Sequence, residues 1–108
     1  MRYSFGDTVI DEEAFELRRR GTRIHVEPLA LELILYMAQR RGALIQKSEL
    51  LDALWSGVSV TDASLTRTVS VARKALRGAA LIENVYGRGY RLYATSTPSG
   101  VNADRDAG

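Results

Sequence analysis

The chain has 108 residues, a formal net charge of +2 and 45% hydrophobic residues, which suits one compact domain with its own core. It contains no cysteine, and this excludes a disulfide framework and a thiolate metal site. Charged residues interrupt the apolar stretches within a few positions, so the sequence shows neither a signal peptide nor a membrane span. We therefore expect a cytoplasmic protein.

The first 27 residues alternate in polarity as β-strands do, in runs at residues 3–5, 8–10, 14–17 and 22–27. Turn-forming residues separate the runs, which predicts a four-stranded antiparallel meander. The last run holds His25, the single histidine, which we expect to be a sheet residue rather than a catalyst or metal ligand.

The meander also contains the most conspicuous charge run of the chain, Arg18, Arg19 and Arg20, directly before Gly21. We predict a solvated hairpin end at this point, with contact to phosphate as the alternative.

A first helix is predicted from Pro28, because the missing N–H of proline costs nothing in a first helical turn. Apolar positions across residues 31–38 make this helix largely buried. Arg40 and Arg41 favour its C-terminal dipole end, and Gly42 stops it.

A short apolar run at residues 43–45 precedes a second predicted helix at residues 46–55, and a loop follows at residues 56–60. The first two helices start at Glu27 and Gln46, where Ser or Thr would cap better, so both N-caps should be weak.

The most informative segment is residues 61–77, which predicts an amphipathic helix. Its apolar seam consists of Leu65, Val69, Ala72 and Leu76. The opposite face combines small residues with long cations: Ala63, Arg67, Ser70 and Lys74, flanked by Thr66, Val71 and Arg77. Such a face suits a helix that lies closely against a polyanion, although a solvated basic face is the common alternative.

Residues 81–93 predict a β-hairpin, since two β-branched and aromatic runs flank the connection Gly87-Arg88-Gly89. The glycines allow positive φ and present Arg88 at the tip. A cation on a narrow tip can enter the minor groove of DNA, and a solvated turn arginine is the alternative. No third glycine or following helix makes this a nucleotide-binding fingerprint.

Charge is concentrated on this helix and hairpin. Residues 61–91 carry six cations against Asp62 and Glu83, a balance of +4, whereas residues 1–27 balance to −1. We therefore expect residues 61–91 to face an acidic partner.

A meander, three helices and a terminal hairpin make an α+β winged helix-turn-helix domain, whose third helix enters the major groove. Four motifs then resemble the effector domain of the OmpR/PhoB response regulators: ELLDALW at residues 49–55, VTDASL at 60–65, ARKAL at 72–76 and IENVYGRGYRL at 82–92. The resemblance covers residues 3–94, including the N-terminal sheet.

The resemblance implies sequence-specific binding of double-stranded DNA by a bacterial transcription regulator. The implied recognition helix, residues 61–77, contacts DNA through Thr66, Arg67, Ser70, Val71, Arg73, Lys74 and Arg77. In the family the residue that matches Arg73 meets DNA or anchors the helix beside it. In the wing, residues 86–90, Tyr86 stands where relatives often have the minor-groove cation, so this role passes to Arg88. Trp55 and Tyr90 approach phosphates in relatives or serve as core aromatics.

The resemblance also implies partners. Relatives pair on direct-repeat sites, and the loop before the recognition helix can contact RNA polymerase; here that loop is Ser56, Gly57, Val58, Ser59 and Val60. Ala63 and Ser70 occupy positions where arginine is frequent, which predicts modest affinity. No cofactor is implied.

We predict a DNA-binding domain at residues 1–94 and a polar linker at residues 95–108. Because no receiver domain precedes the first strand, the chain is more similar to regulators of the CadC/ToxR group. We expect it to be the front of a longer protein, with a free-standing small regulator as the alternative.

Two other function classes compete with DNA reading. A winged helix can act as a protein-interaction module without specific DNA readout, and weak, sequence-independent DNA binding would favour it. An enzyme needs a convergent acid, base or nucleophile set, and the scattered carboxylates and single His25 assemble none.

Overall fold

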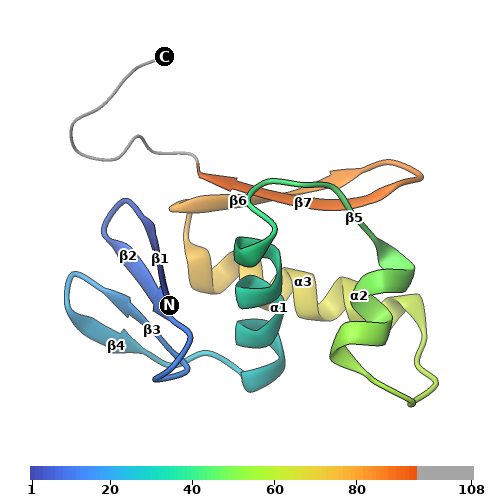
Figure 1. The fold of residues 1–108 in the computed structure, drawn as a ribbon, viewed down its shortest axis with the longest axis horizontal. Helices are drawn as coiled ribbons and strands as arrows, with labels where there is room; N and C mark the ends of the chain where they lie inside the picture. The colour runs from blue at the N-terminus through green and yellow to red at the C-terminus, as the bar shows by residue number, and fades with distance from the viewer. Residues whose placement is uncertain (95–108) are drawn as a thin grey trace.

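Two antiparallel sheets flank a body of three helices (Figure 1). The computed structural model describes residues 1–94, and the linker predicted for residues 95–108 lies outside them. The N-terminal sheet stands at one end, and the second sheet runs along α3 above the helices. This arrangement confirms the predicted α+β winged helix-turn-helix fold.

The N-terminal sheet has the strand order β1-β2-β3-β4 and is a simple meander, as predicted. Its strands are β1 (Arg2–Phe5), β2 (Thr8–Asp11), β3 (Glu16–Arg19) and β4 (Thr22–Ile24). Ile10 and Leu17 pair across β2 and β3 and are fully buried, so one face of this sheet packs on the helices.

Two strand boundaries differ from the prediction. The third strand begins at Glu16 rather than at residue 14, because the Ala14 amide donates to Asp11 Oδ1 (3.1 Å) and Phe15 has a φ of 52°, which makes a turn. The fourth strand ends at Ile24, the last residue of β4 with a partner on β3. The prediction of a sheet position for His25 is therefore wrong, and this residue is exposed after β4.

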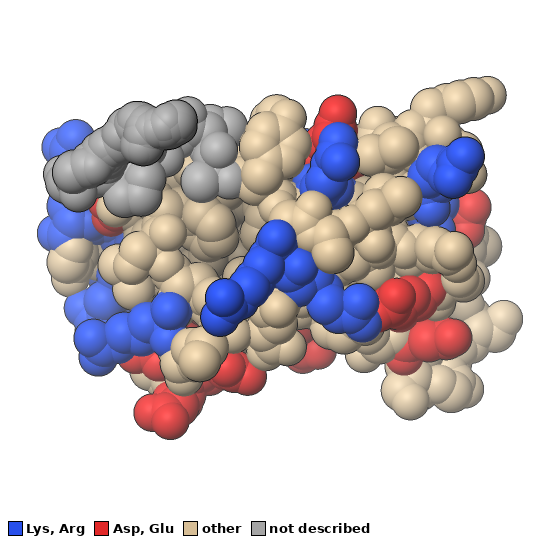
Figure 2. Space-filling view, turned by 45° about the horizontal axis from the view of Figure 1, so that its top comes forward, with Lys and Arg blue, Asp and Glu red and all other residues tan. Residues whose placement is uncertain are grey.

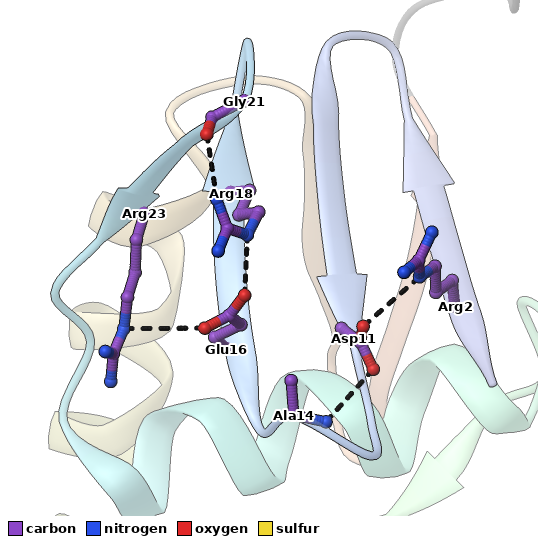
Figure 3. Close-up of polar contacts among 7 residues, drawn as sticks. All are labelled: Arg2, Asp11, Ala14, Glu16, Arg18, Gly21 and Arg23. Atoms are coloured by element: carbon purple, nitrogen blue, oxygen red, sulfur yellow. Dashed lines mark hydrogen bonds and ion pairs between the residues drawn. The ribbon is translucent and has the colours of Figure 1, made fainter.

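Exposed ion pairs tie this meander together (Figure 3). Arg2 pairs with Asp11, and Glu16 forms ion pairs with both Arg18 and Arg23. Arg18 also donates to the Gly21 carbonyl at 2.9 Å, which closes the hairpin end.

The arginine run 18–20 is only partly a solvated hairpin end. Arg18 and Arg20 are exposed, as predicted, but Arg19 is half-buried. Its guanidinium donates to Thr8 Oγ1 (3.2 Å) and to the Ala75 carbonyl near the end of α3 (2.6 Å). Arg19 therefore connects the N-terminal sheet to the third helix.

The helices are α1 (Pro28–Gln39), α2 (Lys47–Leu54) and α3 (Asp62–Leu76). α1 begins with Pro28 and is largely buried, as predicted, and neither Glu27 nor Gln46 makes a side-chain cap hydrogen bond. The arginines expected in the last turn of α1 lie just beyond it, since Arg40 is the C-cap and the positive φ of 53° at Arg41 ends the helix.

The second sheet has the order β5-β7-β6, from β5 (Ile45–Gln46), β6 (Ala80–Val85) and β7 (Gly89–Ala94). The β6–β7 hairpin is the predicted wing, whereas β5 was expected only as an apolar run. Ile45 pairs with Tyr90 and Gln46 with Gly89, so β5 fixes the wing to the helical body.

The core lies where the two sheets and the three helices meet. All of these elements contribute fully buried side chains: Ile10, Leu17, Leu33, Ile34, Met37, Ile45, Leu50, Leu65, Val69, Leu76 and Ile82. No helix within residues 1–94 has the length and apolarity needed to cross a membrane.

Candidate nucleic-acid interface

α3 forms as a long, exposed amphipathic helix for local reasons. Residues 62–76 contain no glycine or proline, Asp62 lies in the first turn, and Arg73 and Lys74 lie in the last, which suits the helix dipole. Arg77 ends the helix in the left-handed conformation, with a φ of 49°. The predicted segment 61–77 is thus confirmed, with its two end residues acting as caps.

The two faces of α3 divide as the sequence indicates. Leu65, Val69, Ala72 and Leu76 are buried. The opposite face is open to solvent, with Val71 half-buried at its margin, and its exposed residues are Ala63, Thr66, Arg67, Ser70, Lys74 and Arg77. A shallow groove along this face is lined by these small residues, by Arg67 and Lys74, and by Glu27 from the start of α1.

Arg67 lines this groove and is paired with Glu27. Its Nη1 and Nη2 atoms each lie 3.4 Å from one carboxylate oxygen of Glu27. Sequence reasoning missed this contact, although Glu27 was conspicuous as a poor N-cap residue before Pro28. The sequence did show an unusual residue type at position 27, but its partner Arg67 is 40 positions away and could not be identified from the sequence.

Arg73 has a different role. Its Nε and Nη2 atoms both donate to the Ile82 carbonyl of β6, at 3.1 and 2.8 Å. Of the two roles implied for this position, the contacts supply the anchoring one, because they fix α3 to the wing strand.

Lys74 and Arg77 extend the basic surface toward the N-terminal sheet. Both line a second groove with Arg19, His25 and Val71. Within residues 1–94, neither side chain forms a hydrogen bond or an ion pair. Their charges are therefore available to an anion.

The wing turn consists of Tyr86, Gly87 and Arg88, since Val85 pairs with Gly89 and the Arg88 amide donates to the Val85 carbonyl at 2.9 Å. Tyr86 is 97% exposed, and Arg88 is exposed beside a polar groove lined by Gln46, Lys47 and Ser48. In Figure 1 this turn lies at the same end of the molecule as α2.

Gly89 does not serve the tip as predicted. It is buried in β7, and a Cβ built on it would lie 2.0 Å from the Ile45 carbonyl oxygen. The second wing glycine is therefore required by the close approach of β5.

The remaining predicted positions lie apart from α3. Tyr90 is buried, with 4% exposure, and Trp55 is half-buried at the end of α2 against the core; both placements favour the core role. In the loop 56–60, Ser56, Gly57, Val58 and Ser59 are exposed and Val60 is half-buried.

Charge elsewhere is mixed in sign. Figure 2, which brings the top of Figure 1 forward, shows Lys and Arg side chains interspersed with Asp and Glu, most of the acidic ones in the lower half. Among residues 1–94 no group of three or more His, Cys, Asp or Glu side chains could hold a metal ion.

An exposed third helix anchored to a β-hairpin defines the winged helix-turn-helix class of domains. Residues 21–92 match the family described as "Transcriptional regulatory protein, C terminal". The chain belongs to this family, the OmpR/PhoB-type DNA-binding domains, and the resemblance seen in the sequence is confirmed.

Relatives in bacteria support this assignment. The chain is 28% identical over 92 residues to the transcriptional activator CadC of Escherichia coli K12, covering 81% of this chain and 18% of CadC. It is 33% identical over 94 residues to the transcriptional regulatory protein CseB of Streptomyces coelicolor, covering 84% of this chain and 39% of CseB. The chain thus spans less than half the length of these relatives.

Solved structures agree. The DNA-binding domain of E. coli CadC has a TM-score of 0.74 at 27% identity, covering 84% of this chain and 90% of that domain. The RstA DNA-binding domain of Klebsiella pneumoniae, solved in complex with the RstA box, has a TM-score of 0.70 at 25% identity, covering 82% of this chain and 93% of that one.

Proposed function

We propose that this chain binds double-stranded DNA in a sequence-specific manner, as the DNA-binding domain of a bacterial transcriptional regulator. α3 enters the major groove, and the wing, residues 86–90, lies at the adjacent minor groove. The exposed face of α3 carries this proposal, because small residues let the helix approach the groove floor while Arg67 and Lys74 reach from it. Family membership and the DNA complex of the similar RstA domain support it.

Each exposed residue of this face has a proposed role. Arg67 reads a guanine edge, since its guanidinium can donate to O6 and N7 together. Ser70 and Thr66 contact neighbouring bases or sugars, and Val71 lies at the margin. Lys74 and Arg77 neutralise backbone phosphates, which sets affinity and register more than sequence preference.

The wing is proposed to sense the shape of the minor groove through Arg88. An A·T-rich segment has a narrow minor groove with an enhanced negative potential, which attracts an arginine. Arg73 supports minor-groove contact by the wing indirectly, because its bonds to the Ile82 carbonyl hold the wing strand β6 next to α3.

Two partner contacts are also proposed. Two copies pair on direct-repeat DNA, and the loop 56–60 contacts RNA polymerase, which its exposed Val58 would suit. Replacing Val58 with Ser should reduce transcription from a target promoter while leaving DNA affinity unchanged.

The decisive test is selection of bound sites from random duplex DNA with the purified chain. We expect a recovered motif of two half-sites in the same orientation. Sequence-independent recovery would contradict the proposed function and favour the protein-interaction alternative.

A further inference from the structure

Glu27 is the one carboxylate lining the groove on the exposed face of α3. It precedes Pro28 and forms the N-cap of α1, where its backbone carbonyl accepts from Leu31 at 3.0 Å. Its side chain makes no cap hydrogen bond, as expected for a glutamate, which is not among the residue types that cap helices well. The carboxylate contacts Arg67 of α3 instead.

The carboxylate and the Arg67 guanidinium meet as two forks, with both N···O distances at 3.4 Å. The side chains are 49% and 68% exposed, and ion pairs this open to water are weak. The pair can therefore exist in the free protein and still open when a better acceptor arrives.

Which DNA group can replace Glu27 as the acceptor for Arg67 depends on the DNA sequence. A guanine edge offers O6 and N7, two acceptors that match the fork of an arginine as a carboxylate does. A base edge with a single acceptor offers Arg67 one hydrogen bond in place of its two contacts with Glu27, and an edge with a donor offers none. Phosphates also accept two bonds, but they border the groove of the DNA, whereas Arg67 lies on the exposed face of α3 with Ala63 and Ser70, the face proposed to meet the base edges.

Glu27 itself then opposes indiscriminate binding. While the two side chains remain paired, the Glu27 carboxylate cancels the charge of Arg67. A complex with a wrong sequence then gains no counterion release from this arginine.

We infer that Glu27 is a specificity-determining residue that holds Arg67 in the free protein and yields it only to a base edge with two acceptors. The inference rests on the proposed function, since it assigns Glu27 to the same DNA-reading surface. Glu27 is thus a positioning residue for Arg67, and it disfavours wrong sequences by competing with them for this arginine.

The test compares Glu27→Gln with the unaltered chain on two duplexes, the site recovered by selection and a scrambled sequence of equal composition. Removal of one negative charge should raise affinity for the scrambled duplex about fivefold near 0.15 M salt. The selected site should gain less, so the ratio of the two dissociation constants should fall about threefold. Equal gains on both duplexes would overturn the inference and leave Glu27 a simple charge.

Two control variants separate the pair from general electrostatics. Glu32→Gln removes the same charge from an exposed position of α1 that takes part in none of the ion pairs of residues 1–94, and it should leave the ratio unchanged. In an Arg67→Ala background, Glu27→Gln should also leave the ratio unchanged, since no arginine remains to be held. A fall of the ratio in that background would contradict the inference.

The proposed function and this inference fail differently. If the unaltered chain bound the selected and scrambled duplexes equally, sequence-specific reading would be wrong and the inference would fall with it. If the unaltered chain discriminated and Glu27→Gln discriminated equally well, only the inference would be wrong.

Discussion

The N-terminal sheet and the surface formed by α3 and the wing differ in whether all of their cationic side chains have internal partners. Every arginine within residues 1–27 has a partner there or in α3, as in the pairs Arg2–Asp11 and Arg20–Asp7. On α3 and the wing, Arg67, Arg73 and Arg91 also have partners, but the side chains of Lys74, Arg77 and Arg88 have none among residues 1–94. Cations without an internal partner therefore lie on α3 and the wing, and not in the N-terminal sheet.

The N-terminal sheet and the wing also differ in the contacts that fix them in place. Exposed ion pairs join the hairpins of the N-terminal sheet, and each such pair contributes little to stability. The wing is held by backbone packing at Gly89 and by the bonds from Arg73 to Ile82. A single substitution should therefore damage the wing much more than the N-terminal sheet.

The largest effect should come from Gly89→Ala. Its Cβ would lie 2.0 Å from the Ile45 carbonyl oxygen at a φ of 153°, so β5 must separate from β7, at a cost of at least about 2 kcal/mol in unfolding free energy. Urea denaturation measures this. Gly87→Ala is the comparison variant: its Cβ meets nothing within 4 Å, so only the φ of 72° opposes the substitution, at a cost of about 1 kcal/mol. A loss for Gly89→Ala no larger than this would mean that packing against β5 is unimportant.

The next effect should be on base reading by α3. Arg67→Ala should cost about 1–3 kcal/mol at the selected site and flatten discrimination at one base position. Lys74→Ala should weaken all sequences more evenly, because a phosphate contact carries no sequence information. Titrations on the selected and scrambled duplexes check both variants. Equal losses of affinity on the two duplexes for Arg67→Ala would mean that Arg67 contacts only phosphate.

The sequence predicts the elements whose signals are local. The period of the apolar residues places α3 correctly, and Pro28 marks the start of α1. The strand β5 was missed because two residues cannot show a period, and their strand geometry exists only by pairing with β7. The start of β3 was misplaced because the Asp11–Ala14 turn depends on a side-chain bond.

The site is predictable to the level of a helix face. Exposure of Arg67, Ser70 and Lys74 follows from the same periodicity that buries Leu65. The periodicity does not predict pairing between residues far apart in the sequence. Glu27 at the start of α1 pairs with Arg67 of α3, and Arg73 donates to a carbonyl of β6. Sequence spacing could not have distinguished Arg73 from Lys74, its neighbour, which lacks such a partner.

A smaller effect is expected at the wing tip, where Arg88→Ala should lower DNA affinity by about 1 kcal/mol and reduce the salt slope by about one counterion. The loss should be greatest on sites with A·T-rich flanks. Titrations against salt and flank composition measure it. If the affinities of Arg88→Ala and of the unaltered chain changed equally between A·T-rich and G·C-rich flanks, minor-groove sensing by Arg88 would be wrong.

Arg20→Ala is the matched control from the other sheet. Arg20 is 82% exposed and is paired with Asp7, so its removal should leave DNA affinity and the salt slope nearly unchanged. A loss equal to that of Arg88→Ala would break the distinction between paired and available arginines.

The smallest effect concerns acid stability of the N-terminal sheet. The hydrogen bond from Arg20 holds the pKa of Asp7 below its ordinary value of 3.8, and the Ala14 amide does the same for the pKa of Asp11. Because the folded state favours both carboxylates in their charged form, their contribution to stability is full above about pH 4 and is lost as the pH falls through the lowered pKa values. Amide exchange in β1–β4 should therefore accelerate below about pH 4 relative to exchange in β6 and β7, and Asp7→Asn should weaken this pH dependence. Carboxyl NMR titration of Asp7 and Asp11 gives the midpoints directly, and midpoints at or above 3.8 would show that the contacts of these two carboxylates do not stabilise the sheet.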